Sequence, residues 1–201
     1  MGEPKRTKAT YQDVLDAPPH KVAEIINGEL RVSPRPALAH QSVATTLGAE
    51  LVLPFGRGRG GPGGWIIMAE PELHFGEDVL VPDLAGWRRE RLPQVNDAFM
   101  TLPPDWLCEV LSRSTEKIDR AEKLPVYAAV GVRHVWLISP RLRTLEVLRL
   151  HEGKWLNAAI FKDDDRVRAE PFEAIELELA SLWADLPPPL RAGEPALDYA
   201  F

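Results

Sequence analysis

The chain has 201 residues, of which 45% are hydrophobic and 27% charged, and its formal net charge is −6. These values are typical of one globular domain, and no apolar stretch approaches the ~18 residues that a membrane-spanning helix needs. The acidic balance argues against a protein that coats nucleic acid, although carboxylates that hold metal ions would also lower the net charge.

The N-terminal part of the chain predicts a short helix followed by a β-hairpin. Residues 1–10 are basic and polar without the apolar core of a signal peptide, so we expect a flexible N-terminus and a cytoplasmic protein. Helical spacing is expected at residues 11–15. Asn27-Gly28 lies between two apolar runs and supplies the two positive φ angles of a tight hairpin turn. Glu24 sits inside the first run, either as a candidate site carboxylate or as a solvent-facing hairpin residue.

A helix, a glycine-rich loop and several strands are expected next. The spacing of apolar residues predicts an amphipathic helix over 37–53, with His40 near its start as a packing or a functional side chain. The glycine-rich segment 54–64 lacks the Gly-Lys-Ser/Thr ending of a phosphate loop and predicts a flexible connection. Strands are predicted at residues 65–68, 72–75 and 79–87. The last of these contains Val81-Pro82-Asp83.

A carboxylate stands in the middle of an otherwise apolar strand predicted at residues 106–112. Glu109 is flanked by Cys108 and Val110, and a run of this kind is typical of a strand covered on both faces. Burying an ionised carboxylate costs several kcal/mol unless it is paired or binds a metal, so Glu109 is the strongest site candidate. Cys108 is the single cysteine, which excludes an intrachain disulfide and favours a small buried hydrophobe.

The C-terminal half predicts a helix packed beside further strands. The helix begins at Ser114 or Thr115, is kinked or restarted by Pro125, and ends at Gly131. Strands are predicted at residues 132–139, 145–150 and 155–161, the last two paired across a Glu-Gly turn. A short helix or strand is expected within 175–186, and the proline-rich residues 187–201 predict an extended tail.

Asp83, Glu109 and Lys123 together suggest metal-dependent phosphodiester chemistry. Mg²⁺ prefers carboxylate oxygens and waters, and strands that neighbour each other in a sheet lie ~4.8 Å apart, so two strand carboxylates can reach one ion. The lysine would stabilise the charge that develops on the phosphate. Taken singly, Asp83 could be an ordinary turn residue and Lys123 a surface lysine.

The order of these fragments resembles a known family. They are Glu24, Asn27-Gly28-Glu29-Leu30, His40, Val81-Pro82-Asp83, Glu109-Val110-Leu111-Ser112, Lys123, Tyr127-Ala128 and Gly131-Val132. Over residues 11–186 they resemble the Uma-type restriction endonuclease family, once catalogued as a domain of unknown function within the PD-(D/E)XK nuclease superfamily. The resemblance implies an α/β (α+β) fold with a restriction-endonuclease-like core, in which helices flank a mixed central β-sheet that carries added antiparallel strands.

The resemblance also implies roles for individual residues. Asp83 and Glu109 match the metal-binding acids, Glu24 an upstream acid of the same metal shell, and Lys123 the catalytic lysine. In the usual superfamily pattern that lysine lies two residues after the second acid, and Leu111 occupies this position here. His40 matches a histidine expected to contact a phosphate or a water.

The function expected from the resemblance is Mg²⁺-dependent (or Mn²⁺-dependent) endonuclease cleavage of DNA by a homodimer. The tail residues Leu197, Tyr199 and Phe201 could form an arm between subunits. The alternative is a non-catalytic nucleic-acid-binding or dimerisation module in which Glu109 and Lys123 form a buried ion pair. Hydrolysis of a small phosphate ester is a third hypothesis. The basic candidates for a DNA-binding surface are Lys5, Arg6, Lys8, Arg57, Arg59, Arg88, Arg89 and Arg91.

Overall fold

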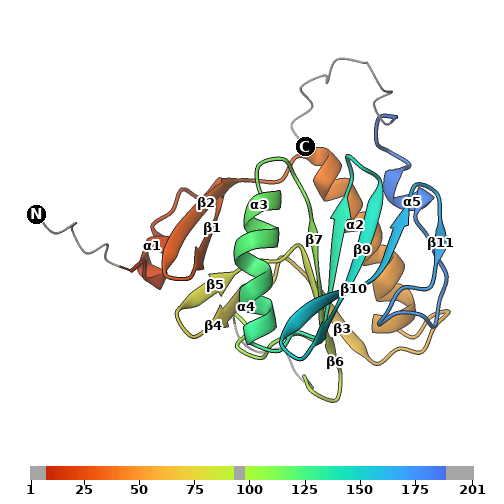
Figure 1. Cartoon of the computed structure of the whole chain (residues 1–201), viewed down its shortest axis with the longest axis horizontal. Helices are drawn as coiled ribbons and strands as arrows, with labels where there is room; N and C mark the ends of the chain where they lie inside the picture. Colours follow the sequence, from red (N-terminus) through yellow and green to blue (C-terminus); the bar gives the residue numbers. More distant parts are fainter. Residues whose placement is uncertain (1–7, 93–97, 189–201) are drawn as a thin grey trace, which may run out of the picture.

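A computed structural model describes residues 8–92 and 98–188 and has a six-stranded sheet at its centre (Figure 1). The strand order is β10-β9-β8-β7-β6-β3. The strands are β3 (Trp65–Ala69), β6 (Leu84–Arg88), β7 (Trp106–Val110), β8 (His134–Ser139), β9 (Thr144–His151) and β10 (Lys154–Lys162). Since β7 and β8 are parallel and the other neighbours antiparallel, the sheet is mixed, as predicted.

Two smaller sheets accompany the central one. The first has the order β2-β1-β5-β4 and the second pairs β11 with β12. Their strands are β1 (Lys21–Ile26), β2 (Glu29–Pro34), β4 (Leu73–Phe75), β5 (Asp78–Leu80), β11 (Arg166–Val167) and β12 (Leu177–Glu178). The hairpin turn between β1 and β2 is confirmed, because Asn27 and Gly28 have φ angles of 54° and 77°. This hairpin brings Glu24 close to the end of β7, in a cleft that Glu109 and Val110 also line.

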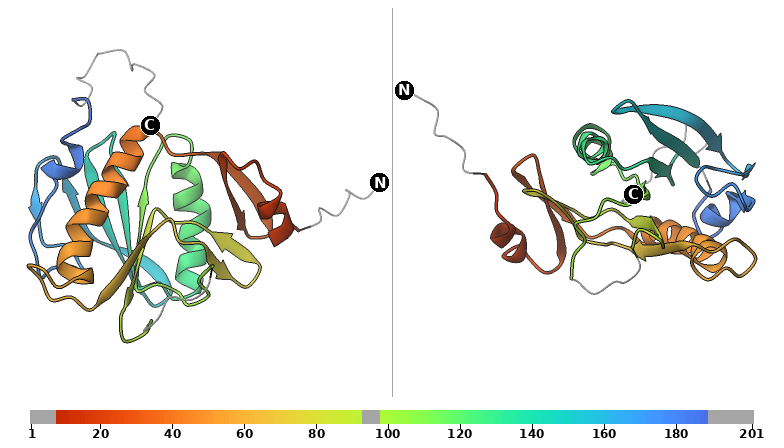
Figure 2. Two further views of the ribbon diagram at one scale, coloured as in Figure 1. Left: turned by 180° about the vertical axis from the view of Figure 1, so that it is seen from behind. Right: turned by 90° about the horizontal axis from the view of Figure 1, so that it is seen from below.

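Helices cover both faces of the central sheet (Figure 2). The helices are α1 (Tyr11–Leu15), α2 (Leu38–Leu51), α3 (Glu116–Ile118), α4 (Leu124–Ala129) and α5 (Ala180–Trp183), and the π-helical turns are η1 (Val52–Gly56) and η2 (Asp119–Lys123). α2 and α5 lie on one face, and the continuous α3-η2-α4 segment lies on the other. Each face therefore has its own hydrophobic core.

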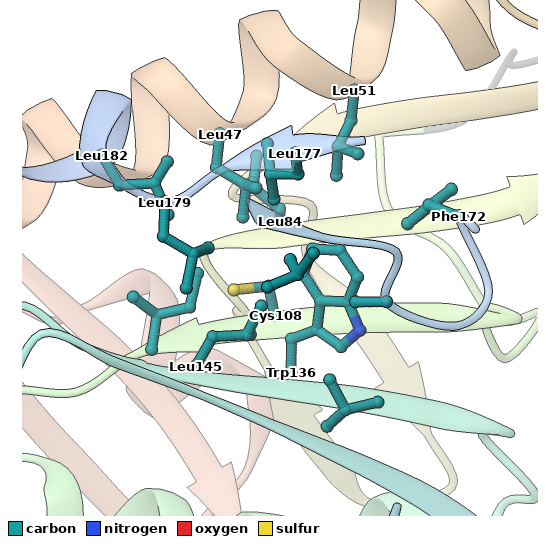
Figure 3. Packing of buried hydrophobic residues seen from close by; sticks show 14 of the residues in the cluster. Leu47, Leu51, Leu84, Cys108, Trp136, Leu145, Phe172, Leu177, Leu179 and Leu182 are labelled. Atoms are coloured by element: carbon teal, nitrogen blue, oxygen red, sulfur yellow. The ribbon is translucent and has the colours of Figure 1, made fainter. Parts of the chain in front are cut away.

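The alternation along β7 explains how a carboxylate is held in this fold. Trp106, Cys108 and Val110 point into the core beneath α2, part of which is drawn in Figure 3. Leu107 belongs to the core beneath α4, and Glu109 follows it on the same side of the strand. Every residue of β7 is buried, so the predicted coverage of both faces is confirmed. Burial raises the pKa of the Cys108 thiol well above its ordinary value, which agrees with a structural cysteine.

The prediction of one strand over residues 79–87 is wrong. The chain forms β5 up to Leu80 and β6 from Leu84, and these strands belong to different sheets. Val81-Pro82-Asp83 is the break, because proline has no N–H to donate to a continuing ladder. The break frees the Asp83 carboxylate to accept a hydrogen bond from the backbone N–H of Val110, at 2.6 Å.

The other elements agree with the predictions made from the sequence, with one further correction. Pro125 lies in the first turn of α4, so the predicted restart of that helix is confirmed, and Gly131 follows it with φ 82°. The glycine-rich segment is not a loop from its first residue, because Pro54 lies within η1, and backbone hydrogen bonds from Arg59 to Leu53 and from Gly63 to Pro54 close the rest of the loop onto η1. Residues 175–186 contain both a short strand and a short helix.

Several predictions fall partly or wholly on residues that the structure does not describe. Residues 1–7 of the predicted flexible N-terminus and residues 189–201 of the predicted tail lie outside the described ranges, as do Lys5, Arg6 and the proposed arm. The homodimer stays a prediction. Within residues 8–92 and 98–188, no helix has both the length and the apolar character to cross a membrane.

Candidate active site

All five residues singled out from the sequence line one cleft. Glu24 comes from β1, His40 from the start of α2, Asp83 from the β5–β6 break, Glu109 from β7 and Lys123 from the end of η2. The volume of the cleft that the centre of a water molecule can occupy is about 60 Å³. One water needs ~10–15 Å³ on this measure, so the cleft has room for several waters or a partly hydrated ion.

Asp83 is fixed at the mouth of the cleft by two contacts. Its Oδ2 accepts the Val110 N–H at 2.6 Å and lies 3.3 Å from Nε2 of His40. The Asp83 side chain remains 14% exposed, so its other oxygen can face solvent or a ligand. Burial lowers the pKa of His40, but the hydrogen bond to Asp83 and its negative charge outweigh burial, and the net pKa is raised. His40 is therefore a helix residue whose ring faces the cleft, and its contact with a phosphate or a water stays a prediction.

Lys123 lies at the centre of a ring of carboxylates. Its Nζ is 2.9 Å from Oε1 of Glu24, 3.4 Å from Oε1 of Glu109 and 3.4 Å from Oδ1 of Asp119. The lysine is 5% exposed, so these contacts are largely shielded from solvent. Although it follows Glu109 by a strand end and a helical segment, Lys123 reaches that acid directly. Lys123 and Glu109 therefore face each other in the cleft.

Two of the three carboxylates around Lys123 accept additional hydrogen bonds. Tyr127 donates its hydroxyl to Oε1 of Glu109 at 2.6 Å, and the Val81 N–H donates to Oε1 of Glu24 at 2.8 Å. Glu24 is 5% exposed and faces the cleft, so its alternative interpretation as a solvent-facing hairpin residue is wrong. The strand register places its side chain where β1 approaches η2.

The charges in the cleft are not balanced. Burial raises the pKa of Glu109 well above its ordinary value, and the neighbouring charges of Asp119, Asp83 and Glu24 raise it further, against the opposing effect of Lys123. Burial likewise raises the pKa of Asp119 to about 6. Burial lowers the pKa of Lys123, but the three carboxylates outweigh it and keep the lysine charged. One lysine and one histidine therefore face four carboxylates.

Two residues, one lining the cleft and one in contact with Glu109 behind it, were not identified as site candidates from the sequence. Asp119 is 3% exposed and shares the helical turn of Lys123, four residues before it. The spacing Asp-x-x-x-Lys was the signal, because residues four apart lie on one helix face. Tyr127 was noted only within the resemblance. Its contact with Glu109 follows from the same four-residue spacing after Lys123, on the face of the helix that meets β7.

The donor set fits a divalent ion of the Mg²⁺ type, although the ligands do not converge in advance. Within the described parts of the chain, no group of three or more His, Cys, Asp or Glu side chains is arranged as metal ligands. Mg²⁺ is ordinarily held by one or two carboxylates and several waters, so such a group is not required. The gathering of four carboxyl groups around one lysine and one histidine in this cleft is the observation that favours a cation here.

Replacing Tyr127 with phenylalanine tests how firmly Glu109 is held. We expect the free energy of unfolding to fall by about 2 kcal/mol, because a buried carboxyl group loses a hydrogen-bond donor that water cannot replace. Urea denaturation in the presence of EDTA measures this change. Tyr11→Phe is the matched control, since Tyr11 also donates to a glutamate, Glu72, but is 37% exposed. Equal effects of the two substitutions would contradict the prediction.

Comparisons with known proteins were consistent with the sequence resemblance. Residues 9–181 match the family model Uma2, described as "Putative restriction endonuclease". No curated protein matches the sequence. Among solved structures, the fold is similar to that of a chain from Anabaena variabilis ATCC 29413, described as "a putative nuclease belonging to DUF820". The TM-score is 0.70 at 20% sequence identity, and the match covers 88% of this chain and 98% of that one.

Proposed function

The chain belongs to the Uma2 family of "putative restriction endonucleases", and on this premise we propose that it is a metal-dependent endonuclease that hydrolyses phosphodiester bonds in DNA. The observation that carries the proposal is the cleft in which Glu24, Glu109 and Asp119 surround Lys123 and which Asp83 also lines. Buried acids around one lysine are costly to maintain for structure alone, since well-packed apolar residues are often at least as stabilising.

Asp83 and Glu109 are the proposed ligands of Mg²⁺ or Mn²⁺, with Glu24 in the same shell. A bound divalent ion would supply an activated water and would neutralise charge on the phosphate. The Val110 N–H and His40 orient the Asp83 carboxylate, and the Tyr127 hydroxyl orients that of Glu109. Because both acids are held by fixed donors, the protein side of the site is largely preorganised.

Lys123 is proposed to stabilise developing negative charge, not to act as the general base. The surrounding carboxylates raise its pKa well above the ordinary value of a lysine, so the neutral amine needed for a base is scarce at neutral pH. A charged ammonium in a shielded cleft instead interacts strongly with phosphate oxygens. Because Asp83 raises the pKa of His40, the imidazole is protonated more readily than an ordinary histidine. We propose that it holds a water or a phosphate oxygen in the cleft.

Incubation of the purified protein with supercoiled and linear DNA tests the proposal. We expect cleavage with Mg²⁺ or Mn²⁺ and none with EDTA, whereas Glu109→Ala should be inactive under all three conditions. Nicking or linearisation of the circular substrate identifies an endonuclease. Glu146→Ala is a control for loss of a glutamate elsewhere, because Glu146 lies on β9 and pairs with Arg120 of η2 outside the cleft.

The alternative of a non-catalytic module is favoured by one observation, namely that Lys123 already pairs with three carboxylates without a metal. A self-sufficient ion cluster predicts no change in melting temperature when Mg²⁺ or Mn²⁺ is added. A metal site predicts a rise that increases with ion concentration. No cleavage together with no thermal shift would overturn the nuclease proposal in favour of this alternative.

A further inference from the structure

Positively charged side chains gather at the end of the central sheet opposite the acidic cleft. Arg57 and Arg59 project from the glycine-rich loop, and Arg88 and Arg89 stand at the end of β6. We call these four residues the arginine cluster. All four are exposed, in a chain whose net charge is −6.

Hydrogen bonds join the glycine-rich loop and the start of β3 to the end of β6, the strand that carries Arg88 and Arg89. The backbone N–H of Arg89 donates to the Gly64 carbonyl at 2.8 Å, and its guanidinium donates to the Trp65 carbonyl at 3.0 Å. The guanidinium of Arg88 lies 4.2 Å from the centre of the Trp65 ring. The loop and the strand end therefore form one surface, with the arginines from both segments on it.

The loop also has a defined shape. Its backbone is closed over η1 by hydrogen bonds from Arg57 to Val52, from Arg59 to Leu53 and from Gly63 to Pro54, at 3.0, 2.9 and 2.9 Å. A side chain at Gly61 would place its Cβ only 2.5 Å from Cβ of Pro54, so the close approach requires glycine. The arginine side chains are thus presented from a fixed backbone, which lowers the entropic cost of binding a ligand.

The charge of the cluster is largely uncompensated. Among the described residues, neither Arg57 nor Arg59 forms an ion pair, and Arg88 interacts with an aromatic ring. Arg91 differs from them because it pairs with the buried Asp105 at 2.6 Å. Free guanidinium groups are suited to bind phosphate with parallel hydrogen bonds.

We propose that the arginine cluster binds the phosphate backbone of duplex DNA that flanks the segment held in the catalytic cleft. The inference rests on the proposed nuclease function. Arg88 follows Asp83 by five residues along one strand, a separation of roughly 17 Å. A DNA duplex rises roughly 3.4 Å per base pair, so the cluster would contact phosphates about five base pairs from the scissile bond.

The surroundings favour a duplex over a single strand. Proteins that bind single strands usually offer exposed aromatic rings on which bases stack. Here Trp65 is 1% exposed and Phe55 is 2% exposed, and Arg88 lies over the Trp65 ring, so the described part of the cluster leaves no aromatic face for a base. A cluster of arginines without an exposed aromatic ring is suited to bind the phosphate backbone of a duplex, in which the bases remain stacked on one another.

Binding of a fluorescein-labelled DNA duplex, long enough to span the cleft and the cluster, tests the inference in EDTA, where no cleavage occurs. We expect Arg57→Ala/Arg59→Ala to weaken binding roughly tenfold at moderate salt and to reduce the slope of log K against log [salt] by about 1.8, the value for two lost phosphate contacts. Arg133→Ala/Arg141→Ala is the control, because it removes equal charge from two other exposed arginines. Arg57→Lys/Arg59→Lys should retain most of the affinity.

The outcomes separate this inference from the nuclease proposal. Loss of affinity only in the loop variant supports the cluster whether or not the wild type cleaves DNA. Equal affinity of the loop variant and the control overturns the cluster, even if the wild type is an active nuclease. Tighter binding of the wild type to an RNA duplex or to single-stranded DNA than to the DNA duplex, or no nucleic-acid binding at all, also overturns it.

Discussion

Asp83→Asn is expected to reduce DNA cleavage by roughly 10²- to 10³-fold while leaving the fold intact. Asparagine keeps a side-chain oxygen that can accept the Val110 N–H, the contact of 2.6 Å that positions residue 83. It lacks the negative charge that would hold a divalent ion. The substitution therefore separates the charge of Asp83 from its shape.

Cleavage rates and thermal unfolding, measured on the same preparations, check this prediction. The melting temperature without metal should match that of the wild type, and the rise caused by Mg²⁺ or Mn²⁺ should be reduced or lost. Asp164→Asn is the control. It makes the same chemical change at an exposed residue away from the cleft. Wild-type cleavage by Asp83→Asn would remove Asp83 from the proposed ligand set.

Lys123→Met is expected to have the largest effect on stability, lowering the free energy of unfolding by about 3–5 kcal/mol at pH 8 in EDTA. Methionine fills much of the same volume, so the loss comes from charge and not from a cavity. Without the ammonium, the carboxylates of Glu24, Glu109 and Asp119 face one another in a shielded site. A buried charge left without its partner carries most of its desolvation cost.

The free energy of unfolding that Lys123→Met loses should be larger at high pH than at low pH. The pKa of Asp119 is about 6 in the folded protein, above the ordinary value of 3.8. Between these values the unfolded chain releases a proton that the folded chain keeps, so the free energy of unfolding falls as pH rises through this window. Removing Lys123 raises the carboxyl pKa values further and extends the penalty to higher pH. The difference between the wild type and Lys123→Met should accordingly shrink from pH 8 to pH 5.

Urea denaturation at pH 5 and pH 8 in EDTA measures both the loss and its pH dependence. Lys117→Met is the matched control, because Lys117 is an exposed lysine one turn and a half earlier in the same helical segment. Its effect should stay within about 0.5 kcal/mol, as for other surface substitutions. If Lys123→Met were no more destabilising than the control, the carboxylate cluster would not depend on the lysine for compensation.

The sequence was most informative where a residue conflicted with its local pattern. Glu109 in an apolar strand indicated a buried, compensated carboxylate, and the structure places it at 3% exposure beside Lys123 and Tyr127. Asn27-Gly28 determined the hairpin, because the two positive φ angles are a local requirement of the turn. Both inferences rest on forces that act within a few residues, so they could be made without a fold.

The sequence by itself therefore determined the main strands, the helices on either side of them and three of the four acids that line the cleft, Glu24, Asp83 and Glu109. Tertiary structure alone decided that the apolar run around Val81-Pro82-Asp83 is divided between two sheets. It also joined the glycine-rich loop to the end of β6, where the N–H of Arg89 donates to the Gly64 carbonyl and its guanidinium to the Gly56 carbonyl. These outcomes depend on contacts between residues far apart in the chain, and local pattern carries no information about which distant partners will meet.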